Sequence, residues 1–182
     1  MAEVKEKRLI HRGRIFDIFK ERIILENGAD TELDIIRHPG ASAIVPLYSS
    51  DTVVLIRQYR HAIGEYIWEI PAGTFSSGED PLSCAKRELL EETGFRARFW
   101  KKLGIITPVP AYSDEMIHVF FAKDLIEEGQ RLEKDELLEV HKVKIDEVYK
   151  MIKEGKIKDS KTIAGIFLTT LWLKDEGDKK NP

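Results

Sequence analysis

Three glutamates stand close together in residues 73–95, which read GTFSSGEDPLSCAKRELLEETGF. On a helix, Glu88 and Glu92 are one turn apart and Glu91 follows Glu88 by three residues, so their carboxylates occupy adjoining parts of one surface. Like charges at these spacings repel by roughly 0.2–0.5 kcal/mol per pair, so the arrangement does not serve stability. The glutamates form either a solvated acidic face or a site for hard divalent cations, because Mg²⁺ and Mn²⁺ prefer carboxylate oxygens.

Residues 80–93 carry helix signals at both ends. Asp80 can cap the first turn, Pro81 suits the first helical position, and Gly94 can adopt the left-handed conformation that ends a helix. The opposite side of this helix is an apolar stripe made of Leu82, Ala85 and Leu89. We therefore expect the acidic face to look outward, into a cleft or into solvent. The spacing alone does not decide between the two interpretations.

Apolar and turn patterns predict strands on both sides of this helix. Residues 8–38 are β-rich, with a hairpin turn at Asn27-Gly28. Further strands are expected at 42–47, 52–56, 99–106, 116–122 and 138–144. Two more helices are expected, at 146–154 and from about residue 160, the second with an apolar stripe made of Ile163, Ile166, Phe167, Thr170 and Leu171. This order predicts an α+β domain with mixed sheets and helices packed against them.

Composition argues against several classes of protein. The chain has 182 residues with 29 Lys and Arg against 32 Asp and Glu, and a net charge of −3 argues against a general nucleic-acid binder. The one cysteine, Cys84, excludes an intramolecular disulfide and a cysteine-based zinc cluster. No apolar run is long enough for a membrane helix, and the charged start lacks the apolar core of a signal peptide. We expect a cytoplasmic protein with neither a membrane nor a nucleic acid as partner.

The complete pattern around the glutamates is more informative than their spacing. Gly73 is followed after five residues by Glu79 and after seven more by Arg87-Glu88-Leu89-x-Glu91-Glu92-x-Gly94-Phe95, which fits every fixed position of the Nudix box. The sequence therefore resembles the Nudix hydrolase family. The resemblance implies hydrolysis of a nucleoside diphosphate linked to another moiety, with divalent metals held by this loop–helix–loop.

The flanking segments resemble the ADP-ribose pyrophosphatase branch of that family. They read RQYRHAIGEYIWEIPAG before the box and TPVPAYSDEMIHVFFAKDL after it, and Pro110 stands sixteen residues beyond Gly94, where that branch has a proline. The resemblance implies a Nudix α/β/α sandwich over residues 39–175, preceded by an N-terminal antiparallel β region (1–38) and followed by a polar tail (176–182). The β region would be the interface of a domain-swapped homodimer.

The resemblance also assigns a metal site residue by residue. The carbonyl of Ala72 and the carboxylates of Glu88 and Glu92 would hold two or three Mg²⁺ ions, or Mn²⁺. Glu91 would support this cluster, and Arg87 would orient the glutamates. A guanidinium beside crowded carboxylates also offsets their repulsion. Glu79, earlier in the box, is expected to be structural rather than a metal ligand.

Members of the branch place a further glutamate on a loop that here corresponds to RLEKDELLEVHKV. Glu136 is our choice, ahead of Glu133 and Asp135, as the general base for the attacking water, as a metal ligand in a closed state, or as both. The alternative is that this acidic loop is only solvated.

The implied substrate contacts lie in separate parts of the chain. Arg60 would contact the phosphates, and Thr74 in the box would contact the substrate. Val109, Pro110 and Ala111, with Glu115, would form a loop that reaches the substrate of the partner subunit. The adenine would lie near the pairs Phe16-Asp17 and Leu33-Asp34. Leu33 is aliphatic where some relatives have an aromatic residue, Phe16 has core packing as its alternative role, and Trp68 is expected in the core.

The implied reaction converts ADP-ribose and water into AMP and ribose 5-phosphate. The alternative substrates are another ADP-sugar or nucleotide sugar, NADH, and a dinucleoside polyphosphate. The alternative that is not an enzyme is a ligand-sensing Nudix module of a transcription regulator. No serine or cysteine nucleophile is required, so Ser83 and Cys84 are expected at the helix surface and in helix packing.

Overall fold

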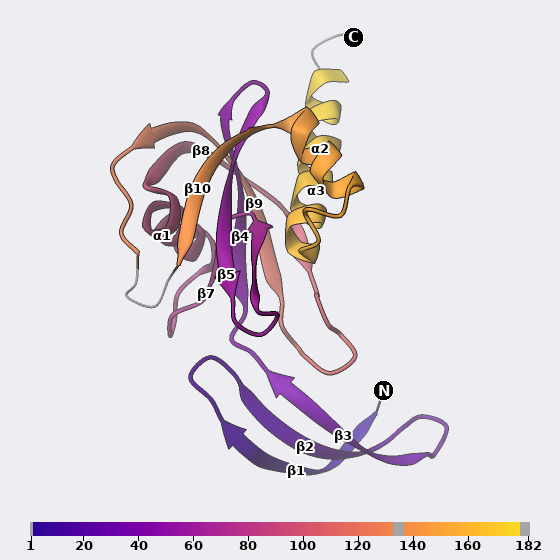
Figure 1. Ribbon diagram of the computed structural model, residues 1–182. Helices are drawn as coiled ribbons and strands as arrows, with labels where there is room; N and C mark the ends of the chain where they lie inside the picture. The colour runs from indigo at the N-terminus through magenta and orange to yellow at the C-terminus, as the bar shows by residue number, and fades with distance from the viewer. Residues whose placement is uncertain (1, 133–136, 179–182) are drawn as a thin grey trace. The chain divides into compact units, whose positions relative to one another are not determined.

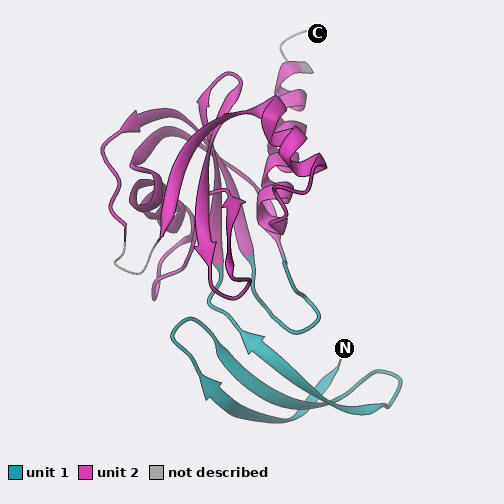
Figure 2. Ribbon diagram, in the orientation of Figure 1, with its two compact units in different colours: residues 1–40, 107–116 teal, residues 41–106, 117–182 magenta. Residues whose placement is uncertain are grey.

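The computed structural model describes residues 2–132 and 137–178 of the chain. The chain forms two compact units, one made of residues 1–40 and 107–116 and the other of residues 41–106 and 117–182 (Figure 2).

The first unit is built on a three-stranded antiparallel sheet of β1 (Glu3–Arg12), β2 (Asp17–Ile24) and β3 (Asp30–Arg37), in that order. The predicted hairpin is confirmed, because β2 and β3 are joined through Asn27-Gly28 and Gly28 has a φ of +81°. Strand β1 begins ahead of the predicted β-rich region. Its residues are all exposed, so the early part of this strand lacks the apolar alternation by which a strand is detected.

The second unit contains a seven-stranded mixed sheet with the order β10-β5-β4-β9-β8, to which β6 adds beside β5 and β7 beside β4. Only the β4–β9 pair is parallel among the described strands. The strands are β4 (Ala41–Ser49), β5 (Thr52–Arg60), β6 (Glu65–Glu69), β7 (Ala72–Thr74), β8 (Phe95–Ile106), β9 (Ile117–Glu127) and β10 (Leu138–Lys144). Every strand expected in this part of the chain is present, and several are longer than predicted.

Helices cover both faces of this sheet: α1 (Pro81–Thr93) lies on one face, and α2 (Ile145–Lys153) and α3 (Ser160–Asp178) lie on the other (Figure 1). Alternate residues of one strand pack against the helices on opposite faces of the sheet, because successive side chains of a strand point to opposite faces. Ile44 of β4 belongs to the core beneath α1, whereas Ala43 and Val45 belong to the core beneath α2 and α3. The expected α+β sandwich is confirmed.

The predicted apolar stripe of α3 is wrong, except for Ile166. Phe167 is 61% exposed, and Ile163 and Leu171 are exposed as well. The helix instead packs through a face of small residues around Gly165, where an added Cβ would lie 2.8 Å from Ile70 Cδ1. The predicted stripe also included Thr170, which is exposed. The buried face of α3 therefore combines this close approach at Gly165 with Ile166 and with Trp172, whose ring centroid lies 4.8 Å from that of Phe121. None of the helices in the described ranges is long and apolar enough to cross a membrane.

Candidate active site

The two ends of α1 form as the sequence predicts. Asp80 Oδ1 accepts hydrogen bonds from the backbone amides of Leu82 and Ser83, at 3.0 and 3.2 Å. Gly94 ends the helix with a φ of +75°, and its amide donates to the carbonyl of Leu90 at 2.9 Å. Local interactions therefore set both ends of α1, whereas the direction of its glutamates is set by the packing of Ala85 and Leu89 against the sheet.

Two of the three glutamates on the acidic face of α1 look inward, against the expectation that this face looks outward into a cleft or solvent, while the Glu91 side chain is 36% exposed. Glu88 is 8% exposed and Glu92 only 2%, and both lie beneath β7. The backbone amide of Ala72 donates to Glu92 Oε2 at 2.9 Å. A Cβ added at Gly73 would lie 1.9 Å from Glu88 Oε1, so the carboxylate occupies the space that a side chain at residue 73 would need. Strand β7 covers these glutamates, and the sequence patterns do not predict this short strand.

One guanidinium links three carboxylates at this face. Arg87 donates to both oxygens of Glu79 at 2.9 Å, to Glu88 Oε1 at 2.5 Å and to Glu91 Oε2 at 3.0 Å. Its Nη2 also donates to the carbonyl of Thr74 at 3.2 Å. The hydrogen bonds from Arg87 hold the pKa of Glu79 below its ordinary value, and Glu79 in turn raises the pKa of Arg87. The guanidinium of Arg87 is therefore hydrogen-bonded to three carboxylates at once, and two of these bonds go to Glu79.

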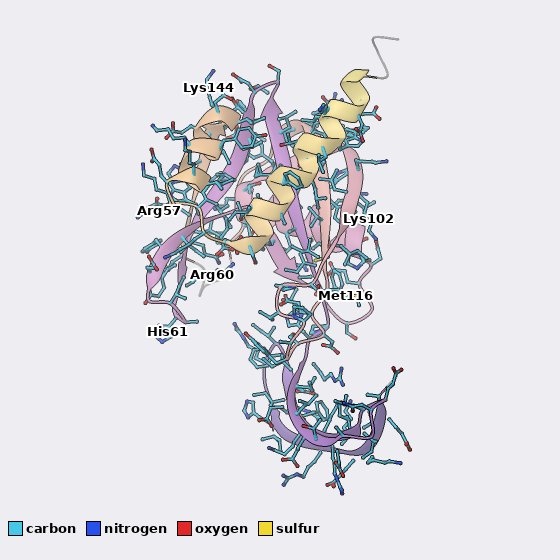
Figure 3. The ribbon with its side chains drawn as sticks, turned by 90° about the vertical axis from the view of Figure 1, so that its right-hand side faces the viewer. Arg57, Arg60, His61, Lys102, Met116 and Lys144 are labelled. Atoms are coloured by element: carbon cyan, nitrogen blue, oxygen red, sulfur yellow. The ribbon has the colours of Figure 1, made fainter. Side chains whose placement is uncertain are left out.

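A second arginine, Arg60 at the end of β5, lies near the first turn of α3 (Figure 3). Its Nε and Nη2 donate to the two oxygens of Glu69, at 2.6 and 2.7 Å. Glu69 raises the pKa of Arg60, and the negative charge of Glu92 contributes to that rise. A bidentate arginine thus lies within the electrostatic field of the buried glutamates.

A NUDIX domain model matches residues 37–165 of the chain, which include the whole of this arrangement. The chain belongs to the Nudix family. Its sequence is 35% identical over 172 residues to the ADP-ribose pyrophosphatase of Bacillus subtilis (strain 168), with 91% of this chain and 93% of that protein covered. It is 36% identical over 159 residues to the methanol dehydrogenase activator of Bacillus methanolicus, with 86% of each chain covered. The family and the expected enzyme class, a Nudix pyrophosphatase, are confirmed.

The fold is also that of a solved structure described as the crystal structure of an ADP compounds hydrolase. The two structures superimpose with a TM-score of 0.85 over 97% of this chain and 96% of the other. Their sequences are 23% identical, so this likeness concerns the Nudix fold alone.

The donor set of the Nudix helix fits a hard divalent cation. Glu79, Glu88 and Glu91 share the guanidinium of Arg87, and Glu92 adds a fourth carboxylate, so the negative charge exceeds the positive charge around α1. In the described ranges no three His, Cys, Asp or Glu side chains already converge as metal ligands. Arg87 and the amide of Ala72 instead occupy carboxylate oxygens that a cation would share.

The cysteine within the Nudix box packs against the loop that precedes it. Cys84 is buried, and its Sγ lies 3.4 Å from the carbonyl oxygen of Gly73. Burial raises the pKa of its thiol to about 12, with the charge of Glu88 adding to the effect. A thiol in this state is not a nucleophile at neutral pH. Ser83 is exposed, as expected.

The remaining residues of the implied substrate site belong to the first unit. Phe16 and Leu33 are exposed, so core packing is not the role of Phe16 there. Asp17 forms an ion pair with Arg12 at 3.8 Å, and Asp34 with Lys20 at 3.2 Å.

Val109, Pro110 and Ala111 form a turn that is attached to β3. The carbonyl of Val109 accepts from the amide of Ser113 at 3.0 Å, and the amide of Ile36 donates to the carbonyl of Tyr112 at 2.7 Å. Glu115 lies 3.8 Å from His38. The candidate loop acids Glu133, Asp135 and Glu136 lie outside the described residues.

Three polar residues that contact Arg60 or the Nudix helix were not predicted from the sequence. Glu69 and Lys161 form an ion pair beside Arg60, and Gln130 Nε2 donates to the carbonyl of Glu92 at 2.6 Å. Glu69 carried one usable signal, since a carboxylate within the apolar run YIWEIP needs a partner if the run is buried. Trp68, its neighbour, packs against the core as expected.

Proposed function

We propose that the chain catalyses the metal-dependent hydrolysis of the pyrophosphate bond of ADP-ribose to AMP and ribose 5-phosphate. The observation that carries this proposal is a pair of buried carboxylates, Glu88 and Glu92, which lie against Ala72 and Gly73 of the short strand β7. A buried negative pair is costly unless a positive charge compensates it. The relative named ADP-ribose pyrophosphatase supports the choice of substrate.

In this proposal the carbonyl of Ala72 and the carboxylates of Glu88, Glu92 and Glu136 would hold Mg²⁺, or Mn²⁺, with two or three ions per site. Such ions, when bound, polarise phosphoryl oxygens and lower the pKa of a bound water. Arg87 keeps Glu88 and Glu91 in fixed rotamers through its hydrogen bonds. The chain thereby contributes a rigid set of oxygen donors that needs little rearrangement.

Three residues would act on the substrate or on the attacking water. Arg60 would bind the phosphates through N–H groups that Glu69 does not use. Thr74, which follows Gly73 in the sequence, would also contact the substrate. Glu136 would accept the proton of the attacking water as general base. A positioned carboxylate in that role contributes roughly 10²–10⁴-fold to the rate.

We further propose that the active unit is a homodimer formed through the first unit. The strands and loops of this unit expose the apolar side chains Val4, Leu9, Ile10, Ile15, Phe16, Leu25 and Leu33. An apolar surface of this kind is typical of a protein–protein interface, and a second copy of the sheet would cover it symmetrically. Phe16, Asp17, Leu33 and Asp34 would contact the adenine, and Val109, Pro110, Ala111 and Glu115 would contact the substrate of the partner subunit.

A substrate panel tests the proposed function. The panel contains ADP-ribose, a second ADP-sugar, a GDP-sugar, NADH, a dinucleoside polyphosphate and ATP, each with Mg²⁺ and phosphatase-coupled phosphate release where the product requires it. The highest kcat/KM is expected for ADP-ribose. If another nucleoside diphosphate derivative has a higher kcat/KM, that compound becomes the proposed substrate. If ATP is the best substrate, the assignment to the ADP-ribose pyrophosphatase branch is overturned. Tight binding of a panel member without turnover would favour a ligand-sensing module.

A further inference from the structure

Glu69 is an almost completely buried carboxylate whose two oxygens meet cations from different elements. The residue is 1% exposed and lies at the end of β6. Its Oε1 accepts from Arg60 Nε, and its Oε2 accepts from Arg60 Nη2 and from Lys161 Nζ. Burial opposes ionisation of Glu69, but the two cations outweigh it and hold the pKa of its carboxyl below the ordinary value.

The Arg60 side chain points toward Glu69, and the strand pairing shows how far it extends to make this contact. In the β5–β6 pairing Glu69 lies opposite Ile56, whereas Arg60 lies opposite Glu65 at the other end of the pair. The Arg60 side chain therefore extends back along the sheet to reach Glu69. Its Nη1 makes no hydrogen bond to any residue in the described ranges, and the side chain is 40% exposed. One edge of the guanidinium is thus fixed by a buried acid while the other remains open.

The acid itself is held in place from the far side. Lys161, in the first turn of α3, pairs with Glu69 and also with Asp159 at 3.1 Å. Asp159 accepts from the amide of Thr162 at 2.9 Å, and the hydroxyl of Thr162 accepts from the amide of Ile70 at 2.9 Å. Two cations and two carboxylates balance in charge, so Glu69 can remain ionised and immobile next to Arg60.

We infer that Glu69 is a positioning residue, which presents the open edge of Arg60 to a phosphate of the substrate. The inference rests on the proposed function, in which Arg60 binds the pyrophosphate. An arginine that is ordered before binding loses less conformational entropy when it engages a phosphate. Glu69 therefore acts on substrate affinity through Arg60, without touching the substrate.

The test compares Glu69→Gln and Glu69→Asp with wild type. Gln keeps the shape but loses the charge, and Asp keeps the charge but is too short to meet both Arg60 nitrogens from the same backbone position. For either variant we expect KM for ADP-ribose to rise about 10-fold or more while kcat stays within about 3-fold. The matched control is Glu65→Gln on the same strand, because the Glu65 side chain forms an exposed ion pair with Lys158 and, among the described residues, no hydrogen bond or ion pair with the Arg60 guanidinium. Its KM should not change.

A double-mutant cycle separates positioning from a purely structural role. In an Arg60→Lys background, which lacks the planar guanidinium, Glu69→Gln should raise KM by less than about 2-fold further, because the effect passes through the arginine. Thermal unfolding gives the folded fraction by which kcat is corrected.

The outcomes distinguish this inference from the proposed function. If Arg60→Lys raises KM but both folded Glu69 variants keep the wild-type KM, Glu69 is only a structural link to α3 and the inference is overturned. Failure of both Glu69 variants to fold would assign the same structural role and also overturn it. If wild type hydrolyses another member of the panel, KM for that compound is measured instead. If it hydrolyses none, the proposed function fails and the inference fails with it.

Discussion

The backbone amide of Ala72 donates a hydrogen bond to Glu92 Oε2 at 2.9 Å, which ties β7 to the last turn of the Nudix helix. The residue expected to offer its carbonyl to a metal thus uses its amide to hold one of the expected metal-binding carboxylates. Strand and helix are thereby attached to each other at the point where the proposed metals would bind.

Replacing Glu92 by Gln tests this attachment and the metal site together. The amide oxygen of Gln can still accept from Ala72, so the fold should persist, whereas the negative charge needed for a divalent cation is lost. We expect kcat at saturating Mg²⁺ to fall by at least about 10²-fold, with little change in the thermal unfolding midpoint. Near-normal turnover at saturating metal would show that Glu92 is not a metal ligand.

Replacing Gly73 by Ala tests the packing of Glu88 beneath β7. The new Cβ would lie 1.9 Å from Glu88 Oε1, so the carboxylate or the strand must move. We expect a loss of roughly 1–3 kcal/mol in the free energy of unfolding, together with a large loss of activity. Gly177→Ala is the control, because a Cβ there meets nothing within 4 Å on the surface of α3. Urea unfolding of the three proteins measures the difference.

The loop acids are ranked by their effect on turnover. Glu136→Gln should lower kcat by about 10²-fold or more while KM changes little, because the residue is proposed to take a proton from water. Glu133→Gln and Asp135→Asn should have weak effects, and they serve as neighbouring controls of the same charge. Steady-state kinetics on ADP-ribose decide the order, and the largest loss identifies the base.

The proposed dimer predicts that activity depends on the state of association. A two-fold interface of obligate size buries about 2,000 Å² or more, so a charge placed within it should separate the subunits. Ile10→Glu on β1 should give a folded monomer with almost no activity. Ile105→Glu, a similarly exposed position on β8 of the second unit, should leave the mass and activity unchanged. Light scattering with parallel assays provides the test, and a fully active monomer would contradict a shared site.

The sequence predicted those features of the fold and site that depend on neighbouring residues: helix ends, a hairpin turn and contacts within one helix. Asp80 and Gly94 indicate both ends of α1, because capping and left-handed termination depend on a few neighbouring residues. The hairpin at Asn27-Gly28 was predicted for the same reason. The box pattern placed Arg87 beside the glutamates, and its hydrogen bonds to Glu88 and Glu91 follow from their spacing on one helix.

Contacts between distant segments were not predictable from these patterns. The burial of Glu88 and Glu92 depends on β7, three residues long, pairing with the start of β4. The ion pair between Glu69 and Lys161 joins residues 92 positions apart. The buried face of α3 includes the close approach of Gly165 to Ile70, whereas four of the five residues of the predicted stripe are exposed. Each of these features depends on which surfaces meet, and a single segment does not contain that information.

The position of Cys84 gives the molecule an internal probe of its own opening. Its thiol is the only one in the chain, and it lies beneath the segment that leads away from Gly73. A reagent such as an aromatic disulfide can reach this sulfur only after that segment has separated from α1. The rate of labelling in the native protein therefore reports how often this region opens locally. A cation bridging strand and helix would slow that rate, so metal binding becomes measurable without any substrate.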